Sequence, residues 1–205
     1  EFIDVCGSTS LLFDLWDEPN NYYWRSGLTE FVKFCGVVQA RMRAYQSQLG
    51  IALKFGGTPM SDLEGRNLNR ESYVYPGAMV WIEAILKEGK AKGWQIDFQP
   101  LFQYHTNPAR IIEHVEAVRL LLGKYGYQET EIIWNGLQTE GVARNTEAGV
   151  EYTRELGKLL AGIGVKRMCL DFLEDSGPNN NDGLLKYKTL EEKPRYEFAK
   201  QVSMR

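Results

Sequence analysis

The chain of 205 residues lacks the marks of several protein classes. Its three cysteines, Cys6, Cys35 and Cys169, are odd in number and far apart, which argues against a disulfide framework and against a zinc site. No apolar run reaches the roughly 18 residues that a membrane-spanning helix needs, so we expect no membrane partner. Because His105 and His114 are the only histidines, no metal site is indicated, and we expect no cofactor.

An excess of charge of one sign is also missing. The chain has 24 Lys and Arg residues against 27 Asp and Glu residues, and the sequence pI is near 5.6, so we expect no nucleic-acid partner. No glycine-rich phosphate-binding turn follows any predicted strand, which leaves a nucleotide site unsupported. Apolar residues make up 43% and aromatic residues 12% of the chain, which is typical of a globular protein with a generous aromatic share.

Short apolar runs alternate with long amphipathic segments along the chain. The pattern predicts strands over residues 11–16, 51–57, 94–102, 130–136 and 165–175. A helix is predicted to follow each strand, over residues 29–48, 76–93, 105–126, 146–162 and 191–202. In the helix over 105–126, Asn107 is the predicted N-cap, and Ile111, Val115, Val118 and Leu122 line one face.

This alternation indicates an α/β architecture built on parallel strands. Polar segments rich in Gly, Asn and Asp follow the C-terminal ends of the predicted strands. Such loops build the active site of a (β/α) barrel, so their placement favours that fold. A doubly wound sheet fits the alternation equally well.

The segment LWDEPNNYYW, residues 15–24, sets two adjacent acids between tryptophans. Asp17 and Glu18 repel each other when both are ionised, and Trp16 and Trp24 are costly to expose to water. An isolated acidic pair often only begins a loop or caps a helix. A sugar-binding cleft, however, uses both carboxylates and aromatic rings, so we interpret this segment as part of a site.

The motif FDLWDEPN resembles the fourth-strand W-N-E-P-N motif of clan A glycoside hydrolases, most closely that of the β-xylosidase and α-L-iduronidase family, glycoside hydrolase family 39. LKFGGTP, IDF…YHTNP, EIIWNG and DGLL…KPRYEF resemble later segments of that family, in the same order. The resemblance implies a (β/α)8 TIM barrel, of which residues 1–205 form the C-terminal five β/α units as a single domain.

The same resemblance implies a hydrolase that cleaves β-linked glycosides with two carboxyl groups, roughly 5–5.5 Å apart in retaining enzymes. Glu18 occupies the acid/base position. Ile133 stands at the usual nucleophile position and cannot attack a sugar. Glu131, about 6.6 Å deeper along an extended strand, would replace it only if the strand register shifted by two residues. Glu140 would replace it only if its loop folded back.

Several residues near these carboxylates are implied to contact a carbohydrate. Asp17 stands where the family has an asparagine that donates to the sugar 2-hydroxyl, and an ionised aspartate can only accept. His105 is either a substrate contact or a structural histidine, and Tyr22 and Tyr23 form either a stacking platform or core packing. The substrate-binding candidates are Trp16, Asp17, Asn20, Trp24, His105, Trp134 and Asn135.

Two functions therefore remain open, a glycosidase and a catalytically inactive relative that binds glycans or serves as a scaffold; an unrelated α/β protein is a more distant alternative. TIM barrels typically need about 250 residues and eight strands. We therefore expect a longer polypeptide or a partner chain to supply the missing strands. Residues 11–16 and 168–174 are predicted to be the edge strands, with backbone groups unpaired within this chain.

Overall fold

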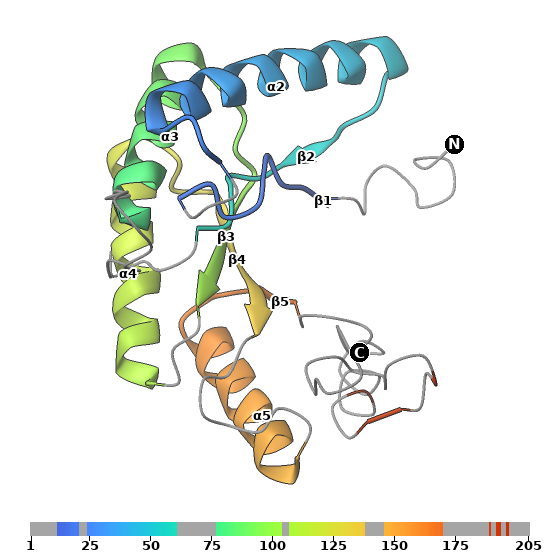
Figure 1. Ribbon diagram of the computed structural model, residues 1–205, viewed down its shortest axis with the longest axis vertical. Coiled ribbons are helices and arrows are strands. Elements are labelled where there is room, and N and C mark those ends of the chain that lie inside the picture. Colours follow the sequence, from blue (N-terminus) through green and yellow to red (C-terminus); the bar gives the residue numbers. More distant parts are fainter. Residues whose placement is uncertain are drawn as a thin grey trace. The chain divides into compact units, whose positions relative to one another are not determined.

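A computed structural model describes residues 12–20, 24–60, 77–103, 107–137, 146–169, 189, 192–193 and 196. Within them, strands and helices alternate along the chain (Figure 1). The strands are β1 (Leu12–Phe13), β2 (Lys54–Phe55), β3 (Phe98–Gln103), β4 (Glu131–Leu137) and β5 (Arg167–Met168). The helices are α2 (Leu28–Leu49), α3 (Ala78–Lys92), α4 (Pro108–Lys124) and α5 (Glu147–Gly162). The predicted alternation is confirmed here, whereas the helix predicted over 191–202 lies almost wholly outside the described residues.

The described residues divide into two compact units. The first comprises residues 1–102 and 113–133, and the second comprises residues 103–112 and 134–205. The prediction that the whole chain forms a single domain stays a prediction.

The first unit holds neighbouring parallel strands. β1 pairs with β2 in parallel, with Phe13 opposite Phe55, and a parallel bridge between Gly56 and Phe98 links the end of β2 to β3. β4 follows β3 in the sheet order, and the arrows of these two strands point the same way in Figure 1. The α/β class with parallel strands is therefore confirmed for the part of the chain that is described.

In the part of the chain that is described, β1, β2 and β5 are two residues long, shorter than the sequence pattern predicts. Pairing nevertheless continues beyond β1 and β2 in an irregular register. The Leu15 amide donates to the Gly57 carbonyl at 3.4 Å, and the Glu18 amide donates to the Pro59 carbonyl at 3.0 Å. The two loops after these strands are thus joined through their backbones.

Helices α2 and α3 cover the core of the first unit. α3 buries a stripe at helical spacing, Ala78, Trp81, Ile82, Ile85, Leu86 and Gly89. The rings of Phe31 on α2 and Trp81 on α3 lie 5.5 Å apart between centroids, and both side chains are fully buried. The predicted apolar face of α4 is also confirmed, since Ile111, Val115, Val118 and Leu122 are at most 2% exposed. The Ala109 amide donates to Asn107 Oδ1 at 3.0 Å, which confirms the predicted cap.

Side-chain amides tie α2 to the N-terminal ends of the strands. Gln39 Nε2 on α2 donates to the Gln95 carbonyl at 2.7 Å. Asp97 Oδ2 accepts from Gln95 Nε2 at 2.7 Å and from the Phe55 amide at 2.8 Å. These bonds use buried or half-buried polar groups for structure, as is typical of the end of a β/α sheet opposite its active site.

The second unit holds β5, α5 and the end of β4. The Cys169 amide, directly after β5, donates to the Trp134 carbonyl of β4 at 2.7 Å. Thr146 Oγ1 caps α5 by accepting from the Gly149 amide at 3.2 Å, and Leu156 and Leu160 are buried on its apolar face. None of the helices that the structure describes is long and apolar enough to span a membrane.

Candidate active site

Glu18 lies in the loop that follows β1, five residues after Phe13. Its amide is held by the Pro59 carbonyl of the neighbouring loop, and its side chain is buried, with the residue 5% exposed. Its φ is +38°, in the left-handed region, which costs a non-glycine residue roughly 1–2 kcal/mol. Such a conformation persists only where surrounding contacts determine it, and it occurs preferentially at functional sites. The loop therefore holds Glu18 in one defined backbone conformation at the C-terminal side of the strands.

Two further carboxyl groups, those of Asp14 and Asp17, lie between β1 and Glu18. Burial, and then the negative charge of Asp17, raise the pKa of Asp14 to about 7. Burial also raises the pKa of Asp17. Both residues keep contact with solvent, but surrounding protein atoms displace part of the water that would stabilise an ionised carboxylate. The raised pKa favours the protonated form of Asp14 more than in a free aspartate, and its side chain remains exposed to solvent. Asp14 was missed among the sequence candidates, although it stands three residues before Asp17.

We expect Asp14→Asn to remove a pH-dependent loss of stability. The folded pKa of about 7 exceeds the value of 3.8 for a free aspartate, so the folded protein binds this proton more tightly than the unfolded chain. The contribution of Asp14 to stability is thus most favourable below pH 3.8, falls as the pH rises to about 7, and is constant above it. Urea unfolding from pH 4 to pH 8 measures the difference between wild type and variant. A difference that stays constant across that range would contradict the raised pKa of Asp14.

An aromatic cluster packs beside this segment. The Trp16 ring meets the rings of Trp24 and Phe34 edge to face, at centroid distances of 5.6 Å and 5.4 Å. Trp24 also contacts Phe31 at 5.1 Å, and its indole N–H donates to the Gly27 carbonyl at 3.0 Å. Trp24 is thus anchored by packing, whereas Trp16 is 39% exposed. Trp16 is the ring of this cluster that can offer a surface to the C–H face of a sugar.

The other predicted substrate-binding residues have different surroundings. Asn20 is 7% exposed and lies in the same loop as Glu18. In the second unit, Trp134 is fully buried, and its indole nitrogen has no hydrogen-bond partner among the described residues; Asn135 beside it is half-buried. The remaining candidates lie outside the described residues: Tyr22, Tyr23, His105 and Glu140.

β4 carries no described carboxylate at the expected nucleophile position. Ile133 is 3% exposed within the strand. Glu131 begins β4, and its amide donates to the Asp97 carbonyl at 3.0 Å, at the N-terminal ends of the strands. The chemistry of a (β/α) barrel takes place at the opposite ends. The placement of Glu131 therefore lends no support to its use as a nucleophile.

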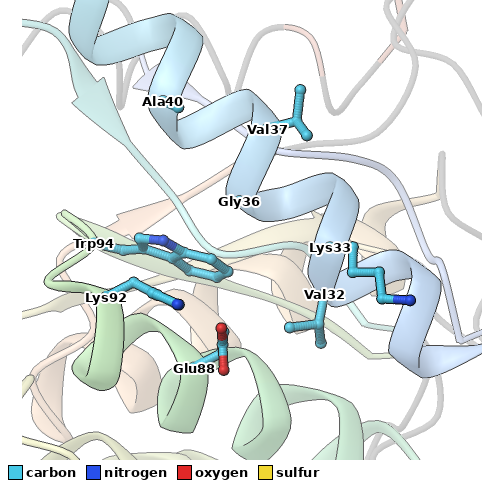
Figure 2. Close-up of a pocket in the computed structure, with 8 residues that line it drawn as sticks. All are labelled: Val32, Lys33, Gly36, Val37, Ala40, Glu88, Lys92 and Trp94. Atoms are coloured by element: carbon cyan, nitrogen blue, oxygen red, sulfur yellow. The ribbon is translucent and has the colours of Figure 1, made fainter.

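A separate pocket of about 430 Å³ lies between α2 and α3 (Figure 2). It is lined by Val32, Lys33, Gly36, Val37, Ala40, Glu88, Lys92 and Trp94. Gly36 approaches the Trp94 ring so closely that a Cβ atom there would lie 3.2 Å from Cζ2. Because Trp94 precedes β3, this pocket lies toward the N-terminal end of that strand and not at the loops that carry Glu18.

No protein-family model and no curated protein matches the chain. Solved structures do. A glucosidase from Croceicoccus marinus is similar with a TM-score of 0.60 and 19% identity, over 85% of this chain and 36% of that one. A curdlan-specific exo-β-1,3-glucanase of subgroup III of GH128, from Blastomyces gilchristii, is similar with a TM-score of 0.58 and 21% identity, over 82% of this chain and 64% of that one. The chain thus spans about a third of the first enzyme and just under two thirds of the second. These likenesses show that the chain has a glycoside hydrolase-like fold.

Proposed function

We propose that the chain forms part of a glycoside hydrolase that acts on β-linked glycosides, with Glu18 as the general acid and base. The observation that carries the proposal is the buried, left-handed Glu18, fixed to the Pro59 carbonyl in the loops after two parallel strands. An acid/base residue needs such a fixed position and a partly desolvated carboxyl group. The motif around it resembles that of glycoside hydrolase family 39, and the fold is glycosidase-like.

Carbohydrate is the proposed ligand because the surroundings of Glu18 suit it. Trp16 offers an exposed aromatic surface, and Asp17 and Asn20 add polar groups in the same loop. Burial raises the pKa of Asp17, and its carboxylate, when ionised, can accept a hydrogen bond from a sugar hydroxyl where the family's asparagine would donate one. One similar structure is a curdlan-specific exo-β-1,3-glucanase, so β-1,3-glucans join β-xylosides and β-glucosides as the substrates to test.

A catalytically inactive glycan-binding protein is the second candidate. It is favoured by Ile133, a buried apolar residue at the position where the family has its nucleophile. A retaining mechanism needs a second carboxylate opposite the acid/base residue. In that case the loops would bind a glycan without cleaving it.

Turnover and binding measured side by side separate the two candidates. The wild-type protein is incubated with aryl β-xylosides, aryl β-glucosides and β-1,3-gluco-oligosaccharides, and binding of the oligosaccharides is measured by calorimetry. Turnover that Glu18→Gln abolishes supports the hydrolase, and binding without turnover supports the inactive relative. If neither is observed, both candidates are wrong.

We further propose that a longer polypeptide or a partner chain supplies additional strands. In the described strand order, β1 has only β2 as a neighbour, and β5 has only β4. A parallel sheet of this type is normally covered and closed, because open strand edges expose unpaired backbone groups. Hydrogen exchange at the Leu12 amide tests this, because Phe13 and Leu15 direct their peptide groups toward β2 and its loop. We expect fast exchange in the 205-residue chain and slow exchange once the additional strands are present.

A further inference from the structure

Gln99 is a buried glutamine of β3 whose side chain reaches the loop after β2. We propose that Gln99 is a positioning residue for Glu18 and acts through the backbone of residues 57–59. This inference deepens the proposed function and rests on it. Gln99, residues 57–59 and Glu18 all lie within the first compact unit.

The side-chain amide of Gln99 occupies one defined position. The residue is 2% exposed, and its Nε2 donates to the Thr58 carbonyl at 3.1 Å and to the Pro100 carbonyl at 3.0 Å. Both hydrogens of the amide group are therefore used. There is space for this amide because Gly57 has no side chain. A Cβ atom at position 57 would lie 2.9 Å from Cδ of Gln99 and closer still to its Oε1.

The same loop holds the backbone of the candidate active site. The carbonyl of Pro59 accepts from the Glu18 amide at 3.0 Å, and the carbonyl of Gly57 accepts from the Leu15 amide at 3.4 Å. The carbonyl of Thr58, between them, accepts from Gln99 on β3. Residues 57–59 are thus held by β3 on one side and hold residues 15–18 on the other.

Glu18 depends on such support because of its backbone conformation. Its φ of +38° is unfavourable for a residue with a side chain. Surrounding contacts must therefore hold this backbone conformation against the ordinary conformations with negative φ. Removal of Gln99 would leave the Thr58 carbonyl without its described donor and loosen the loop that carries Pro59. If Glu18 relaxed by about 1 Å, catalysis would fall by up to about 10²-fold, because proton transfer needs close alignment.

The test compares two glutamines that both donate to a backbone carbonyl. Gln99→Met keeps the length of the side chain and removes the donor. Gln46→Met is the matched control, because Gln46 Nε2 donates to the Leu53 carbonyl at 2.9 Å, before β2 begins. We expect Gln99→Met to lower kcat by about 10- to 100-fold with KM changed less than about twofold. Gln46→Met should leave both constants unchanged.

Solution NMR provides a readout that does not require activity. The three-bond coupling between the amide and Hα protons of Glu18 reports its φ, and hydrogen exchange of the same amide reports its bond to Pro59. We expect both to change in Gln99→Met and not in Gln46→Met. These measurements test the positioning role of Gln99 even if the wild-type protein hydrolyses no glycoside. The absence of hydrolysis would overturn the proposed function but not the positioning role.

Two results would overturn the positioning role. One is an unchanged coupling and an unchanged exchange rate at Glu18 in Gln99→Met. The other is an equal loss of activity in Gln99→Met and Gln46→Met, which would indicate a general loss of stability. If Gln99→Met does not fold, the same measurements on Gln99→Asn decide, because asparagine keeps a buried amide group but is one carbon shorter, which withdraws the donor from the Thr58 carbonyl.

Discussion

The proposed role of Glu18 as general acid predicts that replacing it with glutamine lowers the hydrolysis of β-glycosides with poor leaving groups by about 10²–10⁴-fold. Glutamine has nearly the same shape as glutamate but cannot transfer a proton to the departing oxygen. A leaving group that departs as a stable anion needs no such proton. We therefore expect the loss for a dinitrophenyl glycoside to be much smaller in the glycosylation step. The measurement is kcat/KM for an alkyl and a dinitrophenyl glycoside of the same sugar.

Glu30→Gln is the matched control for this experiment. Glu30 is an exposed residue of α2 whose carboxylate lies 3.8 Å from Lys33 Nζ, so its replacement should change neither activity nor folding. Circular dichroism of Glu18→Gln should match that of the wild-type protein. A loss of the same size for both leaving groups would show that Glu18 supports the fold or binds substrate without acting as the acid.

Gly56→Ala is expected to destabilise the protein by about 1–3 kcal/mol or more, because it overpacks the junction of β2 and β3. A Cβ atom at Gly56 would lie within 2.9 Å of three atoms of the Phe98 ring, a distance that real side chains do not adopt. Either the ring or the strand has to move. Phe98 is 3% exposed, so there is little free space for the ring.

The opposite result is expected for Gly123→Ala. Gly123 lies in α4, and a Cβ atom there would meet nothing within 4 Å. Alanine should therefore stabilise the helix by about 0.5–1 kcal/mol relative to glycine. Urea denaturation of both variants gives the two free energies of unfolding. Equal effects of the two substitutions would contradict the close approach of Gly56 and Phe98.

Phe98→Leu provides an independent check on the cause. If the ring of Phe98 is what excludes a side chain at Gly56, a smaller residue at position 98 should reduce the cost of Gly56→Ala. A double-mutant cycle measures this coupling. Purely additive effects would place the cost of Gly56→Ala elsewhere in the strand.

Local chemistry explains why the helices could be predicted from the sequence. The spacing of Ile111, Val115, Val118 and Leu122 predicts one buried face, and the four side chains are buried as expected. Asn107 was recognisable as a cap because a capping side chain bonds within its own helix turn. The order of strands and helices also follows from runs of residues close together in the chain. Such features need no knowledge of distant contacts.

The details of the candidate site depended on contacts between segments far apart in the sequence. The Glu18 amide donates to the carbonyl of Pro59, some forty residues away, and no local sequence pattern predicts a positive φ at a glutamate. Asp14 acquires its raised pKa from burial by the folded chain, which composition does not reveal. The sequence shows Gln99 as a polar residue inside the apolar run 94–102. That run does not reveal that Gln99 donates to the Thr58 carbonyl.

Local patterns in the amino-acid sequence therefore predict the α/β class and the ranges of the described helices, and they show the resemblance of the segment around Glu18 to a glycosidase motif. The folded arrangement was needed to show that the described β1 and β2 are two residues long, that Ile133 is buried in the core, and that Glu131 begins its strand at the end away from the loops. The physical reason is that strand ends, burial and backbone strain are set by pairing and packing between segments. The free energy of those contacts arises only when the chain is folded.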